Sequence, residues 1–169
     1  MLVKRWLVVQ GNEGSSSSEY GGTMTTYCEG GNACATTRLN NVLFTRMGQS
    51  GLKGRHPVYF NRVGDQSASF VQNCVVHQSY NRGIVLASTN QLRIDFNGLY
   101  DIKGHGIVLE DGNEVQNYIA NNWAMINKKS FTFMTTDTLP AGFYITNPDN
   151  LFVNNKAYGS ERFGFWYDL

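Results

Sequence analysis

The sequence predicts an all-β protein, a right-handed parallel β-helix of about five coils. Three observations lead to this fold class. Only 16% of the residues are charged. Glycine and asparagine are abundant, which is typical of loop-rich β proteins rather than helical ones. Finally, two segments in the middle of the chain repeat each other, and no window shows the apolar period of a long amphipathic helix.

The repeat joins residues 74–86 to residues 97–109, an offset of 23 (97 minus 74), and both copies end in Gly-Ile-Val-Leu. The same frame includes residues 56–60 upstream and residues 163–167 downstream, with a degenerate coil around residues 122–134 between them. Each coil of a solenoid buries its inward side chains only by stacking on its neighbours. A period in the low twenties with two short strands per repeat therefore predicts a parallel β-helix.

Side chains alternate between the two faces of a strand, so each repeated strand has an inward and an outward set. The inward set should form the core: Val58, Phe60, Ile84, Leu86, Ile107, Leu109, Phe165 and Tyr167. The outward set should form a column with a spacing of about 4.8 Å between coils: Tyr59, Val85, Val108 and Trp166. Aromatic rings in such a column are suited to stacking on sugar rings.

A polar turn precedes each repeated strand. Cys74, Asn97 and Asn155 occupy equivalent positions there, with Asn41 and Asn122 nearby. Stacked amides can form hydrogen bonds along a solenoid axis. We expect these residues to form a structural ladder.

The chain is expected to be a single domain over residues 1–169, with a first strand at residues 2–9 and a flexible Gly/Ser-rich insertion at residues 11–36. Cys28 and Cys34 are placed to close a small disulfide loop, whereas Cys74 lies in an apolar strand and should pack as a small hydrophobic residue.

Charge and motifs exclude several classes of protein. Lys and Arg total 14 and Asp and Glu total 13, so we expect no nucleic-acid partner. The apolar run at the start is too short for a signal peptide, and nothing later reaches the ~18 apolar residues of a membrane span. Neither zinc-site spacing nor a phosphate-binding loop is present. No metal site is therefore expected, apart from a Ca²⁺ site formed by acidic side chains.

The repeat brings three cationic or titratable side chains to the start of one strand on successive coils: His56, Arg82 and His105, within about 10 Å of one another. Arg82 suits capture of a uronate carboxylate, or it pairs with Asp101 in a turn. His105 suits general acid or base catalysis near neutral pH, or it is a hydrogen-bonded turn residue.

Acidic residues crowd the turn after Leu109. Glu110, Asp111 and Glu114 suit a glycosidase mechanism or Ca²⁺ binding, or they form a solvated turn. The predicted catalytic residues are His105, Glu110, Asp111 and Asp101, and the predicted substrate-binding residues are Arg82, Arg55, His56, Tyr59 and Trp166.

Five blocks of sequence resemble consecutive blocks of the CEMIP and cell-surface hyaluronidase family, which is related more distantly to fibrocystin. They are residues 54–60 (Gly-Arg-His-Pro-Val-Tyr-Phe), 78–82, 100–105 with 109–112, 143–148 and 159–167 (Gly-Ser-Glu-Arg-Phe-Gly-Phe-Trp-Tyr). The resemblance implies a right-handed parallel β-helix, an extracellular or cell-surface location, and hyaluronan binding or depolymerisation. The glycine-rich domain that precedes the helix in that family is not recognisable here, so we expect the β-helix portion alone, as a fragment of a longer helix.

Three functional hypotheses follow. The first is an extracellular protein that binds or depolymerises hyaluronan or another acidic polysaccharide. The second is a non-catalytic module that binds a glycan or a protein. The third is a lyase or epimerase acting on a different uronate polymer, since the fold alone does not select the chemistry.

Overall fold

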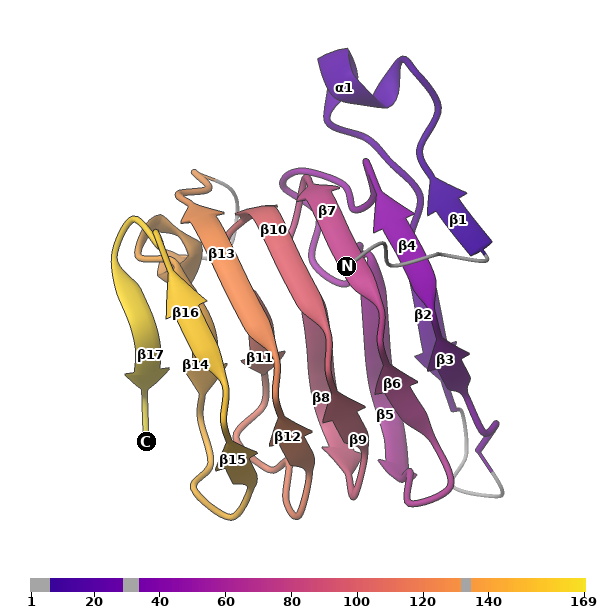
Figure 1. Cartoon of the computed structure of the whole chain (residues 1–169), viewed down its shortest axis with the longest axis vertical. Helices are drawn as coiled ribbons and strands as arrows, with labels where there is room; N and C mark the ends of the chain where they lie inside the picture. The colour runs from indigo at the N-terminus through magenta and orange to yellow at the C-terminus, as the bar shows by residue number, and fades with distance from the viewer. Residues whose placement is uncertain (1–6, 29–33, 132–134) are drawn as a thin grey trace.

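The computed structural model describes residues 7–28, 34–131 and 135–169, which form a solenoid of three parallel sheets (Figure 1). Every third strand belongs to the same sheet. Sheet 1 holds β1 (Leu7–Gln10), β4 (Val42–Thr45), β7 (Val75–Ser79), β10 (Gly98–Lys103), β13 (Trp123–Lys128) and β16 (Lys156–Tyr158). Sheet 2 holds β2 (Met24–Tyr27), β5 (Val58–Asp65), β8 (Ile84–Asn90), β11 (Ile107–Leu109), β14 (Ala141–Ile145) and β17 (Phe163–Tyr167). Sheet 3 holds β3 (Arg38–Asn40), β6 (Phe70–Gln72), β9 (Arg93–Asp95), β12 (Tyr118–Ala120) and β15 (Leu151–Val153).

The predicted all-β parallel solenoid is confirmed, with one difference in the coil. Each coil has three strands instead of the two expected. The additional strands are those of sheet 3, which are three residues long. They are too short to show alternation in the sequence.

The predicted register is confirmed where the repeat is regular. Ile84 pairs with Ile107 and Leu86 with Leu109, the offset of 23 read from the sequence. The inward residues of these strands form one continuous buried cluster with Val58 and Phe60. Phe165 also points inward and stacks on Phe143 at 4.7 Å between ring centroids, but it stays 42% exposed because β17 is the edge strand of sheet 2.

The coil expected around residues 122–134 begins where predicted, with β13 at Trp123–Lys128, but its sheet 2 strand comes later in the chain. The sheet 2 strand next to β11 is β14, and Phe143 pairs with Ile107 at an offset of 36 (143 minus 107). The connection between β13 and β14 is the cause, because it adds a segment with the 3₁₀ helix η1 (Thr135–Thr138). A coil lengthened by such an insertion falls outside any fixed repeat frame.

The Gly/Ser-rich segment is more ordered than expected over its described part. The helix α1 (Ser15–Ser18) lies beyond the end of sheet 1 (Figure 1), and Met24–Tyr27 form β2, which pairs with β5. The Met-Thr-Thr-Tyr stretch therefore belongs to the solenoid and not to an insertion. The start of the predicted first strand lies outside the described residues, and β1 begins at Leu7.

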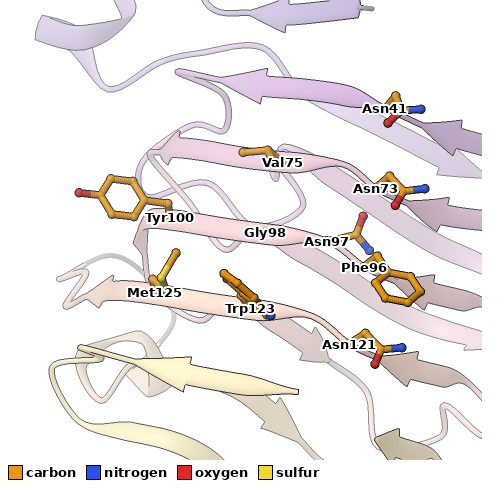
Figure 2. A pocket seen from close by; sticks show the side chains of 10 residues that line it. All are labelled: Asn41, Asn73, Val75, Phe96, Asn97, Gly98, Tyr100, Asn121, Trp123 and Met125. Carbon is orange, nitrogen blue, oxygen red and sulfur yellow. The ribbon is translucent and has the colours of Figure 1, made fainter. Parts of the chain in front are cut away.

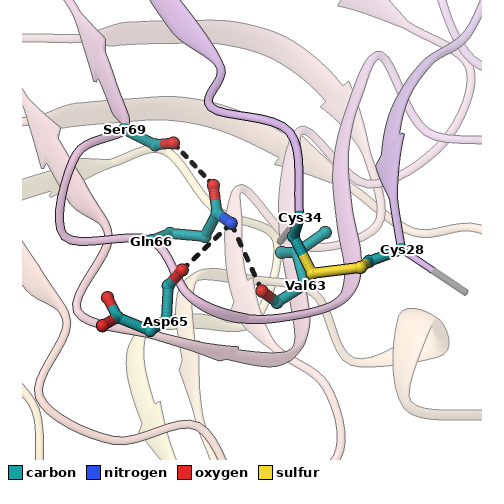
Figure 3. Close-up of a disulfide and its surroundings, with 6 residues drawn as sticks. All are labelled: Cys28, Cys34, Val63, Asp65, Gln66 and Ser69. Atoms are coloured by element: carbon teal, nitrogen blue, oxygen red, sulfur yellow. Dashed lines mark hydrogen bonds between the residues drawn. A yellow bond between two sulfur atoms is a disulfide. The ribbon is translucent and has the colours of Figure 1, made fainter. Parts of the chain in front are cut away.

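The disulfide between Cys28 and Cys34 is present, with 5.3 Å between their Cα atoms (Figure 3). Next to it, the buried amide of Gln66 donates to the carbonyls of Val63 and Asp65 and accepts from the Ser69 hydroxyl, so it holds the turn after β5. Cys74 is buried in the core, as predicted.

The predicted asparagine ladder is confirmed at the turn from sheet 3 to sheet 1. The Asn122 side-chain oxygen accepts from the Asn97 backbone and side-chain nitrogens, at 2.9 and 3.0 Å. Asn155 repeats this contact one coil later, accepting from Asn122. These amides satisfy backbone groups that the turn would otherwise bury without a partner. No helix among the described residues is long and apolar enough to cross a membrane.

Candidate active site on sheet 2

The column of cationic and titratable side chains predicted at the start of the sheet 2 strands exists, but it is buried. The register that pairs Val58, Ile84 and Ile107 places His56, Arg82 and His105 at equivalent positions two residues earlier. Their exposed fractions are 0%, 4% and 0%. They are covered because the connections from sheet 1 to sheet 2 include two long segments at this end of the strands, residues 46–57 and a second segment described at residues 129–131 and 135–140.

Arg82 is the centre of a buried charge network. Its Nε donates to Asp137 Oδ1 at 2.9 Å, its Nη1 to Glu110 Oε1 at 3.2 Å and its Nη2 to Thr136 Oγ1 at 3.0 Å. The two carboxylates and the guanidinium are all nearly inaccessible. Two anions beside one cation leave no positive charge for a uronate. The expected cationic surface is therefore absent from this part of the described structure.

The alternative partner predicted for Arg82 was wrong. Asp101 lies at the end of sheet 1, where its carboxylate pairs with Lys128 Nζ at 2.5 Å. The true partner, Asp137, is 55 residues away from Arg82 in the sequence. It lies in the inserted segment, which follows no repeat, so the sequence carried no signal that could have identified it.

His105 has a structural role in this arrangement. Its Nδ1 accepts from the Ala141 backbone at 3.0 Å, its ring stacks on Tyr144 at 4.5 Å, and its Nε2 lies 3.4 Å from Asp137 Oδ1. Burial, together with the Arg82 charge, lowers the pKa of His105 to about 2. The imidazole is therefore neutral at neutral pH. It is also out of reach of a substrate, so the catalytic role predicted for it has no support here.

His56 is also neutral and buried, with its ring edge-on to Tyr59 at 5.0 Å. Burial is the main cause that lowers its pKa to about 3, followed by the charge of Arg82. A side-chain contact with Asn81 opposes this lowering but does not reverse it. His56 therefore cannot contribute a charge to substrate binding in this conformation.

A polar pocket of about 370 Å³ opens at the edge of this network. It is lined by Lys53, Gly54, Tyr59, Asn61, Arg62, Ala87, Glu110 and Asp111. Tyr59 is 5% exposed, and its hydroxyl donates to Glu110 Oε2 at 3.0 Å. Burial and then the Glu110 charge raise the pKa of Tyr59 above its ordinary value. Both oxygens of Glu110 thus have protein partners, whereas Asp111 is exposed and accepts from the Ser88 hydroxyl at 3.0 Å.

Arg62 reaches this pocket because of an irregularity in β5. The register between β5 and β8 shifts between Asn61 and Gly64, and Arg62 adopts a left-handed backbone with φ 56°. Such bulges redirect side chains and are common beside functional sites. Arg62 is exposed. Sequence reasoning missed Arg62 because a bulge leaves no trace in an alternating pattern, and it missed Lys53 because that residue lies in the loop between β4 and β5, outside the repeat.

The acidic turn after Leu109 is solvated only in part: Asp111 is exposed, as the solvated-turn alternative predicted, but Glu114 is not. Glu114 is fully buried, and its carboxylate accepts backbone N–H groups from Ser88, Asp111 and Gly112 at 2.8 to 3.0 Å. Burial raises the pKa of Glu114, and the backbone hydrogen bonds from Asp111 and Ser88 oppose the increase. Glu114 therefore shapes the turn, and its oxygens are occupied. Among the described residues, no group of three or more His, Cys, Asp or Glu is arranged to hold a metal ion.

The structure does not bring all the predicted site residues together. Tyr59, Glu110 and Asp111 line the polar pocket. Trp166 is half-buried on β17, where it packs on Tyr144 at 5.1 Å between ring centroids. Arg55 is exposed but does not line the pocket. The outward column of Tyr59, Val85 and Val108 is a second buried cluster and not a surface for sugar stacking.

Comparison with known proteins agrees with the resemblance seen in the sequence. The CEMIP beta-helix family model matches residues 19–169. Mouse Fibrocystin-L is 37% identical over 159 residues, which cover 93% of this chain and 4% of that protein. A G8 domain-containing protein of Dictyostelium discoideum is 31% identical over 94% of this chain and 15% of its own length.

Zebrafish cell surface hyaluronidase is 27% identical over 196 residues, which cover 86% of this chain and 14% of that protein. The chain therefore spans a small part of the length of the curated relatives it matches. The family match, by contrast, extends over nearly all of its coils. Together with the three-sheet parallel solenoid, this match shows that the chain belongs to the CEMIP β-helix family.

Proposed function

We propose that this chain is an extracellular carbohydrate-binding β-helix that binds an acidic polysaccharide of the glycosaminoglycan type, with hyaluronan as the first candidate. The proposal depends mainly on one observation: the polar pocket on sheet 2 presents cations and carboxylates together. Lys53 and Arg62 line it together with Glu110 and Asp111.

A uronic-acid polymer needs both kinds of group. Its carboxylate pairs with a guanidinium or an ammonium, and a guanidinium can hold it through two parallel hydrogen bonds. Its ring hydroxyls donate well to ionised carboxylates, which only accept hydrogen bonds. The pocket offers Arg62 and Lys53 for the first contact and Asp111 for the second. The relationship to a protein named cell surface hyaluronidase supports a polymer of this class and an extracellular location.

Binding without cleavage is the form of this proposal that the geometry favours. A glycosidase needs one carboxylic acid to protonate the leaving group and a second carboxylate as base or nucleophile. Glu110 is held by Arg82 and Tyr59, and His105 is buried and neutral. Of the two carboxylates that line the pocket, Asp111 is the exposed one.

Depolymerisation remains the second candidate, because Glu110 and Asp111 line the same pocket and could form a pair of carboxylates. One experiment separates the two. Purified protein is incubated with high-molecular-weight hyaluronan, with and without Ca²⁺, and the size and mobility of the polymer are followed on a gel. A shifted but intact polymer supports binding, a shortened polymer supports depolymerisation, and an unchanged polymer overturns hyaluronan as the ligand. Other uronate polymers tested in the same way cover the lyase or epimerase alternative.

Variants then locate the site. Replacing both Lys53 and Arg62 by alanine should weaken binding by about tenfold or more, because two charge-assisted contacts are lost. The matched control is Arg162→Ala, which removes a cation from an exposed position outside the pocket, beside the Phe163 ring. Equal binding by the double variant and the control would place the polysaccharide elsewhere on the protein.

A further inference from the structure

A second hollow lies on another face of the solenoid, over the outer surface of sheet 1 (Figure 2). It is a groove of about 550 Å³ whose lining combines three aromatic rings, Phe96, Tyr100 and Trp123, with asparagines at the turn from sheet 3. The rings are 59%, 43% and 49% exposed. None of the described residues that line this groove is charged.

Gly98 is the reason that the sheet is hollow here. The register places Gly98 between Val75 and Trp123 in one outward column of sheet 1. A side chain at Gly98 would meet only Val75, at 3.7 Å from the added Cβ, so the space is open. On the far side of Trp123 the same column continues with Lys156, whose Nζ lies 5.6 Å from the ring centroid. The cation covers one face of the indole, and the missing side chain leaves room on the other.

Phe96 occupies a backbone position that does not suit it. The residues stacked at this turn are all left-handed: Asn41 (φ 58°), Asn73 (φ 53°), Phe96 (φ 57°), Asn121 (φ 55°) and Asn154 (φ 53°). Figure 2 shows the first four in one row. Asparagine tolerates this conformation, whereas a bulky side chain adopts it at a cost. Phe96 contributes little to the core, because more than half of it is exposed. Strain of this kind at an exposed aromatic points to a binding role.

We propose that this groove binds a neutral saccharide chain lying along the solenoid axis. Aromatic faces pack on the apolar faces of sugar rings, and amides form hydrogen bonds with their hydroxyls. Asn121 donates to Asp95 and accepts from Asn154, and its amide has a second N–H and a second lone pair beyond these bonds. The groove extends over four coils, about 14 Å at a spacing of ~4.8 Å, which suits an oligosaccharide better than a single ring.

Other ligand classes fit this surface less well. A peptide bound by strand addition needs a free sheet edge, but the groove lies on a sheet face whose strands pair on both sides. A charged polymer needs cations, and none of the described lining residues provides one. A neutral chain with apolar ring faces meets neither difficulty. The site is separate from the polar pocket on sheet 2 and takes a different ligand, so it goes beyond the function proposed above.

The test uses the full 169-residue chain and the tetrasaccharide of β-1,4-linked N-acetylglucosamine as an uncharged probe, with calorimetry as the measurement. Trp123→Ala should weaken binding by about tenfold, the loss expected for one stacked aromatic. Gly98→Val should abolish it by filling the hollow. This variant should still fold, because Gly98 has an ordinary strand backbone and valine favours strands.

Two controls keep the result interpretable. Tyr20→Ala removes an aromatic of similar exposure outside the groove and should bind as the wild type does. Lys53→Ala with Arg62→Ala should leave the neutral tetrasaccharide unaffected, so that failure here and failure of the polar pocket can be distinguished. Equal affinity of wild type, Trp123→Ala and Gly98→Val for the probe, or no binding by the wild type, would overturn the proposal. So would a dimer in sedimentation velocity that Gly98→Val abolishes, because a second copy would then be the occupant.

Discussion

The outer faces of sheet 1 and sheet 2 differ sharply, although the same alternation of side chains produces both. On sheet 2 the outward residues Tyr59, Val85 and Val108 are buried beneath other parts of the chain. On sheet 1 the outward residues Tyr100 and Trp123 are exposed beside an open groove. An outward direction in a solenoid is therefore not the same as a surface position.

The connections between strands explain the difference. Each turn from sheet 3 into sheet 1 is only one or two residues long and cannot fold over the face that it enters. The connections from sheet 1 to sheet 2 include residues 46–57 and a segment described at residues 129–131 and 135–140. These segments bring His56 and Asp137 over the start of sheet 2, where they pack against Tyr59 and Arg82. Coil length thus decides which face becomes an additional core and which remains a surface.

The largest expected effect tests whether the sheet 2 network behaves as core. Arg82→Ala leaves the Asp137 and Glu110 carboxylates nearly inaccessible to solvent without their cation, which should cost about 3–5 kcal/mol of unfolding free energy. The control is Lys128→Ala, which breaks the more exposed pair with Asp101 on sheet 1 and should cost at most about 1 kcal/mol. Urea unfolding measures both. Similar losses for the two variants would remove the distinction between the faces.

The difference between regular coils and inserted segments also explains which features could be predicted from the sequence. The register, the inward core and the asparagine ladder could be predicted from the repeat at Ile84 and Ile107, because a fixed period describes regular coils. It also aligned His56 and Arg82 correctly. Burial of that column could not be predicted, because Asp137 lies in an insertion outside the period. The sheet 1 groove was missed for a different reason: the absence of a side chain at Gly98 becomes a hollow only once its neighbours in the register are known.

A second prediction concerns the pH dependence of the covered face. The pKa values of His56 and His105 fall to about 3 and about 2 in the folded protein, below the ordinary value of 6.5. The unfolded chain therefore binds two more protons than the folded protein between these values and pH 6.5. The contribution of the two neutral histidines to the unfolding free energy should be fully present well above pH 6.5 and should be lost progressively as the pH falls below it. The loss at pH 5.5 relative to pH 7.5 is about 1.4 kcal/mol for each histidine.

Calorimetric unfolding at the two pH values measures this loss, and the variants His56→Leu and His105→Gln should each remove one share of it. Glutamine is chosen at position 105 because its side-chain oxygen can accept the hydrogen bond that the Ala141 backbone N–H now donates to His105. Burial raises the pKa values of Asp137 and Glu114, so these groups act with the opposite sign as the pH falls, and the variants isolate the histidines. If both variants lose as much stability as the wild type between the two pH values, the histidines are not held neutral by burial and the column is open to solvent.

The smallest effect should appear on the exposed face and with the opposite sign. Phe96→Asn restores the residue type that neighbouring coils have at this left-handed position, and should stabilise the fold by about 0.5–1 kcal/mol. Phe96→Ala is the matched control, because it also removes the ring but keeps a residue that disfavours the conformation. Thermal unfolding compares the two. If both variants are destabilised equally, the ring contributes packing and sheet 1 resembles sheet 2. If only Phe96→Asn raises the unfolding free energy, the wild-type chain retains a strained aromatic that folding does not require. Such a result supports a role for Phe96 in contacting a ligand.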